Sequence, residues 1–384
     1  MLQHVLMFLL GLVVLTAGAE AMVRGAARLA LTLGISPLVV GLTIVAFGTS
    51  APEMAVSAGA ALSGSGDLAV GNVVGSNIAN ILLILGLSSL ITPLVVNEQI
   101  IRQEIPIMIG ASALFLALSM DGNINRGEGI LLFVLVIVYA VFLVRQSRRA
   151  SPKSQQAFAE EMPDTQSRWD AHWLVQSALV IAGLGMLVLG AGWLVDAAVA
   201  IARGFGVSDL VIGLTVVAVG TSMPEIATSL VAAWRGERDI AVGNVVGSNI
   251  FNILACMGLA GALADGGIAV SAAARDFDLW VMFAVTLACL PIAMIGRRIV
   301  RVEGAVFVAY YLAYTAYLVL SAIRHDQLTV YAGWISNFAL PATIILMVLY
   351  FVRNQAGDAA LNEPRSAASD PADDHSPSKV DAGL

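Results

Sequence analysis

Two closely similar stretches, GTSAPE at Gly48–Glu53 and GTSMPE at Gly220–Glu225, are the most informative features of this 384-residue chain. They belong to a longer repeat, because residues 41–90 align with residues 213–262 at a constant offset of 172, without a gap, and 31 of the 50 positions are identical. Within it, AVGNVVGSNI occurs unchanged in both copies. Self-similarity at a fixed offset indicates an internal duplication.

The composition predicts a membrane protein. Hydrophobic residues make up 58% of the chain and charged residues only 12%, about half of the roughly 25% typical of soluble domains. A bilayer core about 30 Å thick needs about 20 apolar residues per helix. Eleven stretches meet this requirement: 4–23, 35–62, 68–92, 104–120, 129–144, 172–195, 207–233, 240–263, 278–296, 302–322 and 329–352.

The distribution of positive charge predicts the orientation. With the N-terminus outside and the C-terminus cytoplasmic, 16 of the 20 Lys and Arg residues fall on the inner side, as the positive-inside rule requires. We therefore expect an integral membrane protein with this orientation. The polar stretch 146–170 is predicted to be a cytoplasmic linker, and 354–384, rich in Asp, Ser, Pro and Ala, a disordered cytoplasmic tail.

The count of spans predicts how the two copies are related. Five helices precede the linker, so the second copy enters the membrane from the opposite side. The predicted fold is an all-α polytopic membrane protein with two inverted-topology five-helix repeats, residues 1–145 and 171–323, which form a ten-helix core. An eleventh transmembrane helix is expected within 324–353. Inverted repeats with a midplane site are a recurring architecture of secondary transporters.

Each copy places polar groups deep in an apolar segment. Glu53 and Glu225 fall near the middle of their spans, where translocon scales put a charged residue at about +2.5–3.5 kcal/mol. Pro52 and Pro224 are expected inside these helices, where each interrupts the backbone hydrogen bonding of its helix. Residues three or four apart share a helix face. Polar residues at this spacing share a face with each glutamate or form a stripe on the following helix. They are Thr49, Ser50, Asn72, Ser76 and Asn80 in one copy, and Thr221, Ser222, Asn244, Ser248 and Asn252 in the other.

The donors in this set are hard oxygens. Calcium takes about six to eight oxygen ligands, and sodium should accept the same ones. Each group also has a simpler explanation. A mid-helix Ser or Thr often bonds the preceding turn, the Gly71–Gly75 and Gly243–Gly247 pairs suit close helix packing, and a buried Glu can be a protonated hydrogen-bonding group. Their recurrence in matched frames favours a cation site.

Residues outside the two motifs give no comparable indication of function. The two cysteines, Cys256 and Cys289, lie in apolar stretches and are interpreted as small core residues. Glu104 and Asp276 lie near predicted helix ends, where the helix N-terminus explains them. No histidine cluster, no basic cluster of the kind that binds nucleic acid and no hydrolase motif is found in the sequence, so neither an enzyme nor a cofactor is expected.

GTSxPE followed by GNVVGSN, present twice, resembles the calcium/cation antiporter superfamily and specifically the bacterial sodium/calcium exchangers. The resemblance covers roughly residues 1–322 and implies ten core helices, of which the first and sixth slide across the rest. It implies a calcium site and flanking sodium sites that use backbone carbonyls as well as side chains. The residues so implied are Glu53, Glu225, Thr49, Thr221, Ser50, Ser222, Ser76, Ser248, Asn80, Asn252, Ala46 and Ala218.

The chain departs from part of that superfamily. Some members have an aspartate where this chain has Asn80 or Asn252, and in one branch that acid is associated with potassium co-transport. The proton-coupled branch has an acid after GN in the second motif, which is not found here. The expected function is exchange of calcium for sodium by alternating access. A calcium/proton (or other divalent cation/proton) antiporter is the alternative, and a passive cation channel is a more distant one.

Overall fold

The computed structural model describes residues 2–149, 172–205, 218–323 and 327–335, with a few isolated positions up to 343. Nearly all of them belong to one compact unit, Met1–Ala332, which carries every predicted site residue; Gly333–Leu384 is a second unit. The predicted linker beyond residue 149, the tail at 354–384 and most of the eleventh span lie outside the described residues.

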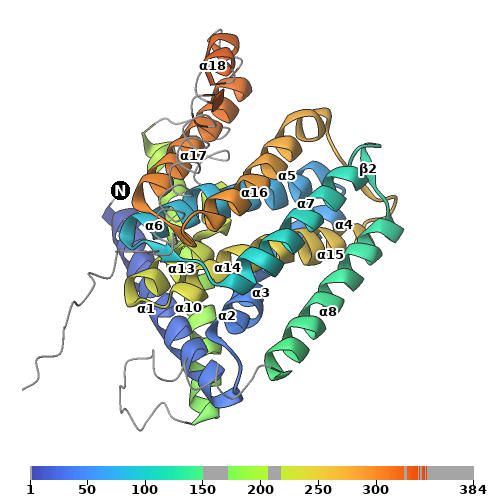
Figure 1. Ribbon diagram of the computed structural model, residues 1–384. Coiled ribbons are helices and arrows are strands. Elements are labelled where there is room, and N and C mark those ends of the chain that lie inside the picture. The colour runs from blue at the N-terminus through green and yellow to red at the C-terminus, as the bar shows by residue number, and fades with distance from the viewer. Residues whose placement is uncertain are drawn as a thin grey trace, which may run out of the picture. The chain divides into compact units, whose positions relative to one another are not determined.

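The first unit is helical, as predicted. Eight of its described helices are long and apolar enough to cross a membrane, and a bent pair, Leu38–Thr49 with Ala51–Leu62, is a ninth candidate. With the labels of Figure 1, the helices are α1 (Leu2–Leu33), α2 (Pro37–Val40), α3 (Ala46–Thr49), α4 (Ala51–Leu62), α5 (Gly66–Ala79), α6 (Gly86–Ile91), α7 (Ile105–Leu118), α8 (Arg126–Arg149), α10 (Trp173–Gly204), α12 (Ala218–Thr221), α13 (Met223–Arg235), α14 (Arg238–Phe251), α15 (Gly258–Leu263), α16 (Leu279–Met294), α17 (Arg301–Ala322) and α18 (Leu328–Trp334).

Two helices are longer than their predicted spans. α1 and α10 each have 32 residues, whereas the apolar stretches were 4–23 and 172–195. At 1.5 Å per residue such a helix is about 48 Å long, well beyond the roughly 30 Å of the bilayer core. Hydropathy detects the membrane crossing, while the helix continues through Arg24 and Arg28, whose charges do not interrupt backbone hydrogen bonding. Similarly, α8 continues to Arg149, into the first residues of the predicted linker.

π-helical turns interrupt the long helices at matching places in the two copies. Asn80–Leu85 joins α5 to α6, and Asn252–Met257 joins α14 to α15 at the repeat offset. A second pair, Ile100–Glu104 and Ala274–Asp278, precedes α7 and α16. A fifth, Gly41–Val45, precedes α3. An extra residue in a turn changes the direction in which the following side chains point, and such turns are frequent at functional sites.

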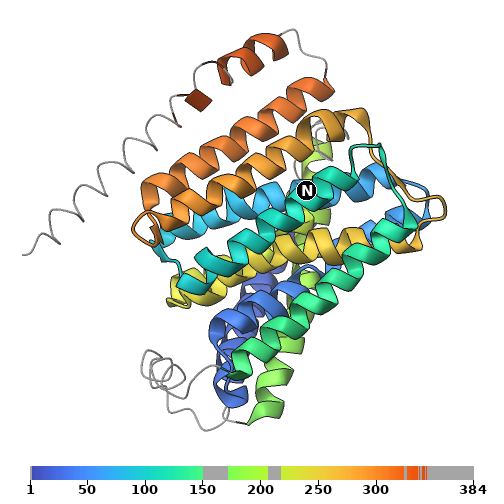
Figure 2. The same cartoon turned by 45° about the vertical axis from the view of Figure 1, so that its right-hand side comes forward.

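The equivalent long helices of the two copies run antiparallel. The start of α5 lies against β3 (Ile268–Ala269), which follows the end of α15, and the start of α14 lies against β1 (Leu94–Val95), which follows the end of α6. In Figure 2 the blue helix over residues 66–91 and the yellow helix over 238–263 cross the bundle in opposite directions. This is the relation that inverted repeats require.

Two short antiparallel ribbons join the copies. β1 pairs with β4 (Arg298–Ile299), and β2 (Asn123–Ile124) pairs with β3. The ribbons lie at opposite ends of the long helices (Figure 2). Each ribbon therefore ties the end of one copy to the other copy.

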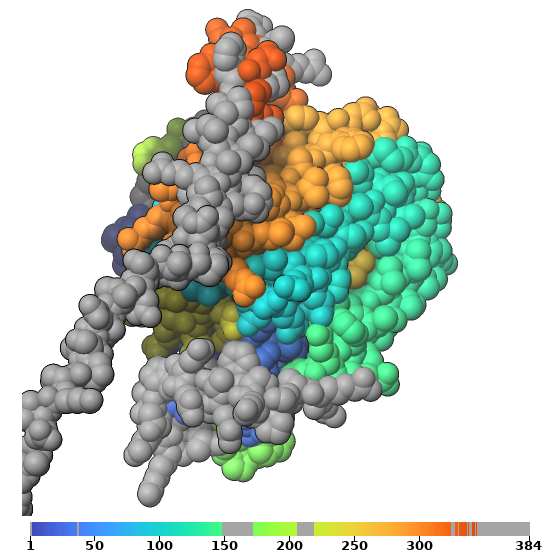
Figure 3. All heavy atoms as spheres, viewed as in Figure 1, coloured from blue at the N-terminus to red at the C-terminus, as the bar shows by residue number. Residues whose placement is uncertain are grey.

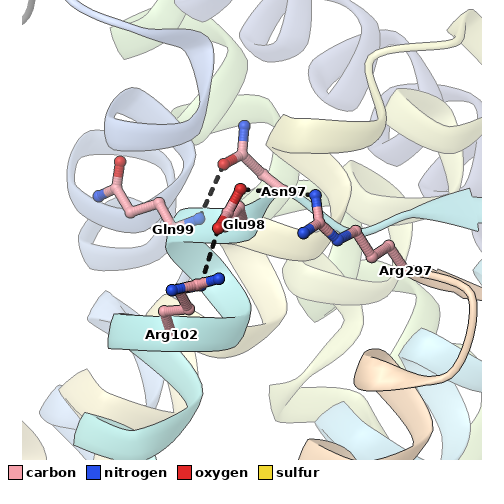
Figure 4. Close-up of polar contacts among 5 residues, drawn as sticks. All are labelled: Asn97, Glu98, Gln99, Arg102 and Arg297. Carbon is pink, nitrogen blue, oxygen red and sulfur yellow. Dashed lines mark hydrogen bonds and ion pairs between the residues drawn. The ribbon is translucent and has the colours of Figure 1, made fainter.

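Next to the β1–β4 ribbon, Glu98 lies between two arginines (Figure 4). Its carboxylate is 2.7 Å from Nε of Arg102 and 3.4 Å from Nη1 of Arg297. The Asn97 side chain accepts a hydrogen bond from the backbone N–H of Gln99 at 2.9 Å, at the start of the same helix. These side chains are largely exposed, so each ion pair contributes about 0–1 kcal/mol.

α1 and α10 pack together along an antiparallel glycine seam (Figure 1). A Cβ added at Gly18 would lie 2.9 Å from the carbonyl of Gly183, and one added at Gly183 would lie 2.7 Å from the carbonyl of Gly18. Gly11 and Gly190 form a similar pair one heptad away. Small residues let helix backbones touch, so these two long helices form one tightly packed pair.

The outer face of α8 is apolar and exposed. Ile130, Val134, Ile137, Val138 and Val141 are each more than 40% exposed, and α8 forms the green side of the surface in Figure 3. A soluble protein rarely leaves such a row in contact with water. In a membrane protein such a row of apolar side chains faces lipid. The buried residues of the unit lie on the opposite side, between the helices.

Candidate cation-binding site

Both GTSxPE motifs form breaks between two short helices. α3 ends at Thr49 and α4 begins at Ala51, with Ser50 outside helical geometry between them and a bend of 45°. Ser222 takes the same place between α12 and α13. The sequence predicted a proline inside a continuous helix. That detail was wrong, because each proline lies in the first turn of a new helix, where its missing N–H costs nothing.

The break places each motif glutamate in the first turn of a helix. Glu53 lies at the start of α4 and Glu225 at the start of α13. Both are buried, with 0% and 1% exposure. The positive end of the helix dipole stabilises a carboxylate in that position. Within the described residues, neither carboxylate forms a salt bridge with a Lys or Arg.

Each glutamate meets a serine of the other copy. The Ser50 hydroxyl donates to Oε1 of Glu225 at 3.2 Å, and the Ser222 hydroxyl donates to Oε1 of Glu53 at 3.3 Å. Ser76 Oγ lies 3.2 Å from Ser222 Oγ. The exchange is reciprocal, as in a two-fold interface, and it brings both acidic motifs to one place.

Two asparagine pairs cross the same interface. The Asn80 amide donates to Oδ1 of Asn249 at 2.9 Å, and the Asn252 amide donates to Oδ1 of Asn77 at 3.3 Å. The Asn249 and Asn77 amides in turn donate to the sulfurs of Met108 and Met282. The sequence analysis did not identify Asn77 and Asn249. Their three-residue spacing from Asn80 and Asn252 was a signal that the four-residue stripe left out.

A third pair of asparagines supports the backbone of the half-helices. The Asn72 amide donates to the carbonyl of Glu53 and to Ser57, and the Asn244 amide donates to the carbonyl of Glu225 and to Ser229. The two asparagines were on the predicted polar stripe, whereas Ser57 and Ser229 were missed. These amides fix the position of each glutamate without contacting its carboxylate.

The remaining predicted residues lie at the same breaks. Thr49 is buried, and its hydroxyl lies 3.2 Å from Asn244 Oδ1 and 3.4 Å from the carbonyl of Ala46. Thr221 ends α12 and Ala218 begins it. Ser248 is buried on α14, which packs against α3 and the π turn before it. All twelve predicted positions thus fall on the two breaks or on the helices that pack against them.

The glycines predicted to allow close helix packing do so in the second copy but, within the described residues, not in the first. A Cβ at Gly247 would lie 2.8 Å from both the Ala46 side chain and the Leu42 carbonyl, so α14 is in close contact with the first break. Gly71 and Gly75 have no such neighbour among the described residues. The repeat counterparts of Leu42 and its neighbours lie mostly within 206–217, outside that part of the chain.

Several oxygens at the site have no hydrogen-bond partner. They are Oε2 of Glu53, Oε2 of Glu225, Oδ1 of Asn80 and Oγ of Ser248, all buried. A buried polar atom without a partner is costly and calls for an explanation. Hard oxygens of this kind are the ligands that cations such as Ca²⁺ take in proteins. Among the described residues no three His, Cys, Asp or Glu side chains cluster as metal ligands, so most of the donors here are neutral oxygens.

Comparison with known proteins adds a family. Residues 3–145 and 175–320 match the family described as "Sodium/calcium exchanger protein". The putative antiporter CaxA of Alkalimonas amylolytica is 43% identical over 84% of this chain and its own full length. The inner membrane protein YrbG of Escherichia coli is 36% identical over 76% of this chain and 89% of its own. The sodium/calcium exchanger MaX1 of Methanosarcina acetivorans is 32% identical, covering 82% and 97%.

A solved structure has the same fold. The sodium-calcium exchanger NCX_Mj superimposes with a TM-score of 0.70 at 30% identity, over 82% of this chain and 98% of its own. The two ranges that match the family nearly coincide with the two repeats predicted from the sequence.

Proposed function

The chain belongs to the sodium/calcium exchanger family of membrane antiporters, and from this premise we propose that it exchanges Ca²⁺ for Na⁺ across the bacterial inner membrane by alternating access. The N-terminus lies outside and the C-terminus in the cytoplasm. The observation that carries the proposal is the reciprocal pairing of Ser50 with Glu225 and of Ser222 with Glu53, which leaves one buried oxygen of each carboxylate without a partner.

Two carboxylates favour calcium as one transported ion. Glu53 and Glu225 carry two negative charges in a region that excludes water, and one Ca²⁺ neutralises both. Their unpartnered oxygens, together with Oδ1 of Asn80, are hard donors of the kind that Ca²⁺ prefers. Calcium is here a transported substrate held by the breaks in α3–α4 and α12–α13.

The neutral oxygens around the carboxylates favour sodium as the other ion. The hydroxyls of Ser222 and Ser76, whose oxygens lie 3.2 Å apart, form one set with the carbonyl of Ala218. The hydroxyls of Ser50 and Ser248 form the equivalent set with the carbonyl of Ala46, because α14 packs against α3. Sodium ions neutralise two carboxylates only when more than one binds. Ca²⁺ and Na⁺ therefore compete for the same oxygens, and a transporter that changes conformation only when the site is neutralised must exchange one load for the other.

Amides at Asn80 and Asn252 favour a site of limited charge. Both residues are buried and form amide pairs across the interface. A third carboxylate at either place would need another cation for charge balance. We therefore expect exchange that does not require potassium.

The test is sodium-gradient-driven uptake of calcium-45 in proteoliposomes. We expect uptake to follow an imposed Na⁺ gradient, and Glu53→Gln or Glu225→Gln to reduce it by more than the roughly 10–100-fold typical of residues that only support a metal ligand. Asp265→Asn, a fully solvated carboxylate in the turn after α15, is the matched control and should retain uptake. Normal flux in either glutamine variant would reject the proposal.

The same two carboxylates support one alternative. An unpartnered oxygen on each of Glu53 and Glu225 can bind a proton as well as share a cation. A calcium/proton antiporter would follow an imposed pH gradient in the absence of Na⁺. Uptake under that gradient alone, at the rate seen with Na⁺, would favour the alternative.

A further inference from the structure

Cys256 breaks the symmetry of the site. It lies in the π turn Asn252–Met257 and is fully buried. Its Sγ is 3.6 Å from Oδ1 of Asn252 and 3.9 Å from the backbone carbonyl of Ser50. The thiol is therefore placed between an amide of the site and the first helix break. At the equivalent position of the first copy the chain has Ile84, so only one of the two halves carries sulfur there.

The surroundings of this thiol are those of a cation site. Helix α4, which carries Glu53, packs against the π turn that carries Cys256. Ser50, whose backbone carbonyl lies 3.9 Å from the thiol, donates its hydroxyl to Glu225. Each glutamate also has a buried oxygen with no hydrogen-bond partner, and such oxygens suit a cation independently of the cysteine.

We propose that Cys256 is a sulfur ligand for thiophilic divalent cations, with Cd²⁺ as the test case, in the site formed by Glu53 and Glu225. The proposal rests on the function proposed above, because it uses the same oxygens. Within the described residues the thiol and carboxylates do not form a cluster of three metal ligands by themselves. The sulfur instead adds one soft donor to a set of carboxylate, amide and carbonyl oxygens.

The chemistry of the donor decides which ions are affected. Thiolates prefer soft metals, whereas carboxylates, carbonyls and water suit Ca²⁺ and similar hard ions. On binding, the S–H bond is replaced by an S–Cd bond and the proton passes to one of the two carboxylates, so the site keeps the two negative charges that one Cd²⁺ neutralises. Cd²⁺ should therefore bind more tightly than the oxygens alone allow, while Sr²⁺, a hard divalent ion, should not respond to the sulfur.

The experiment is a Cd²⁺ titration of the purified full-length protein, followed by the ultraviolet sulfur-to-cadmium charge-transfer band and by equilibrium binding of cadmium-109. Cys256→Ser keeps a donor of similar size with a hard oxygen, Cys256→Ile installs the residue of the first copy, and Cys289→Ala removes the other buried cysteine. Competition by Sr²⁺ reports whether each variant still forms the oxygen site.

We expect the band in the native protein and in Cys289→Ala, and its loss in both Cys256 variants. Cadmium affinity should fall at least about tenfold in Cys256→Ser, with Sr²⁺ competition unchanged. A band that persists without Cys256, or equal cadmium affinity in native protein and Cys256→Ser, would overturn the proposal. A band without any Na⁺- or H⁺-driven calcium flux would instead refute the transport function alone, and flux without a band would refute only the role of the sulfur.

Discussion

Ser50 and Glu225 are 175 residues apart in the chain, yet the hydroxyl of Ser50 donates to Oε1 of Glu225 at 3.2 Å. The mirror contact joins Ser222 to Glu53. Each acidic half-helix is thus completed by a hydroxyl from the break in the other one. Motion of one copy relative to the other must alter both contacts together, which suits a site that opens to one side at a time.

Replacing Ser50 by Ala should weaken the binding of sodium more than the binding of calcium. The Ser50 hydroxyl is a neutral oxygen ligand, whereas calcium binding depends mainly on the two carboxylates. We expect the Na⁺ concentration for half-maximal exchange to rise about three- to tenfold, the size of one hydrogen-bond-like contribution. Calcium–calcium exchange, measured with calcium-45 and no Na⁺, should change little. Ser63→Ala, at the exposed end of α4, is the control, and equal losses in both exchange modes would contradict the assignment.

Asn249→Ala should impair ion binding although Asn249 is not expected to touch the ion. It removes the acceptor that holds the Asn80 amide at 2.9 Å, so Oδ1 of Asn80 is no longer fixed. Residues that orient a ligand typically contribute about 10–100-fold in metal affinity. Isothermal titration with Ca²⁺ measures the change. If affinity holds in Asn249→Ala but falls in Asn80→Ala, the amide pair has no positioning role.

Gly183→Ala should destabilise the protein through the seam between α1 and α10. The added Cβ would lie 2.6 Å from the backbone nitrogen of Met22, so the helices must separate. Overpacking of this kind costs about 1–3 kcal/mol. Gly185→Ala, on the same helix, is a matched control because its Cβ would have no neighbour within 4 Å among the described residues. Thermal unfolding in detergent compares the two, and equal midpoints would show that the seam is not tight.

Tyr139→Phe should destabilise the protein through Glu104. That carboxylate is fully buried and accepts hydrogen bonds from Tyr139 at 2.8 Å, Gln99 at 3.0 Å and Gln103 at 2.6 Å. Loss of one donor to a buried carboxylate should cost about 1–2 kcal/mol.

Thermal unfolding of Tyr139→Phe and of Tyr317→Phe provides the comparison. Tyr317 packs against Phe277, and its hydroxyl has no hydrogen-bond partner in the described part of the chain. A larger loss in Tyr317→Phe would mean that the Glu104 network contributes little.

Glu104 also illustrates what local patterns miss. Its position before α7 suggested a simple interaction with a helix N-terminus, and it does directly precede that helix. Three side chains that bond it, one of them from α8, enclose it completely. Cys256 is similar, since an apolar stretch correctly indicated burial but gave no sign that the thiol points at Asn252 and the break at Ser50. Both depend on neighbours supplied by other helices.

The duplication, the membrane helices and the residues that form the two breaks were predictable from the sequence, because hydropathy and identity at a fixed offset can be read without knowing any contact between helices. The tertiary structure alone decided that Ser50 meets Glu225, that Asn249 holds Asn80 and that Gly18 meets Gly183. Those contacts join segments more than 160 residues apart. The inverted order of the copies was predicted from the number of spans, but the register in which their helices pack and the π turns that redirect side chains are not specified by a helical repeat in the sequence.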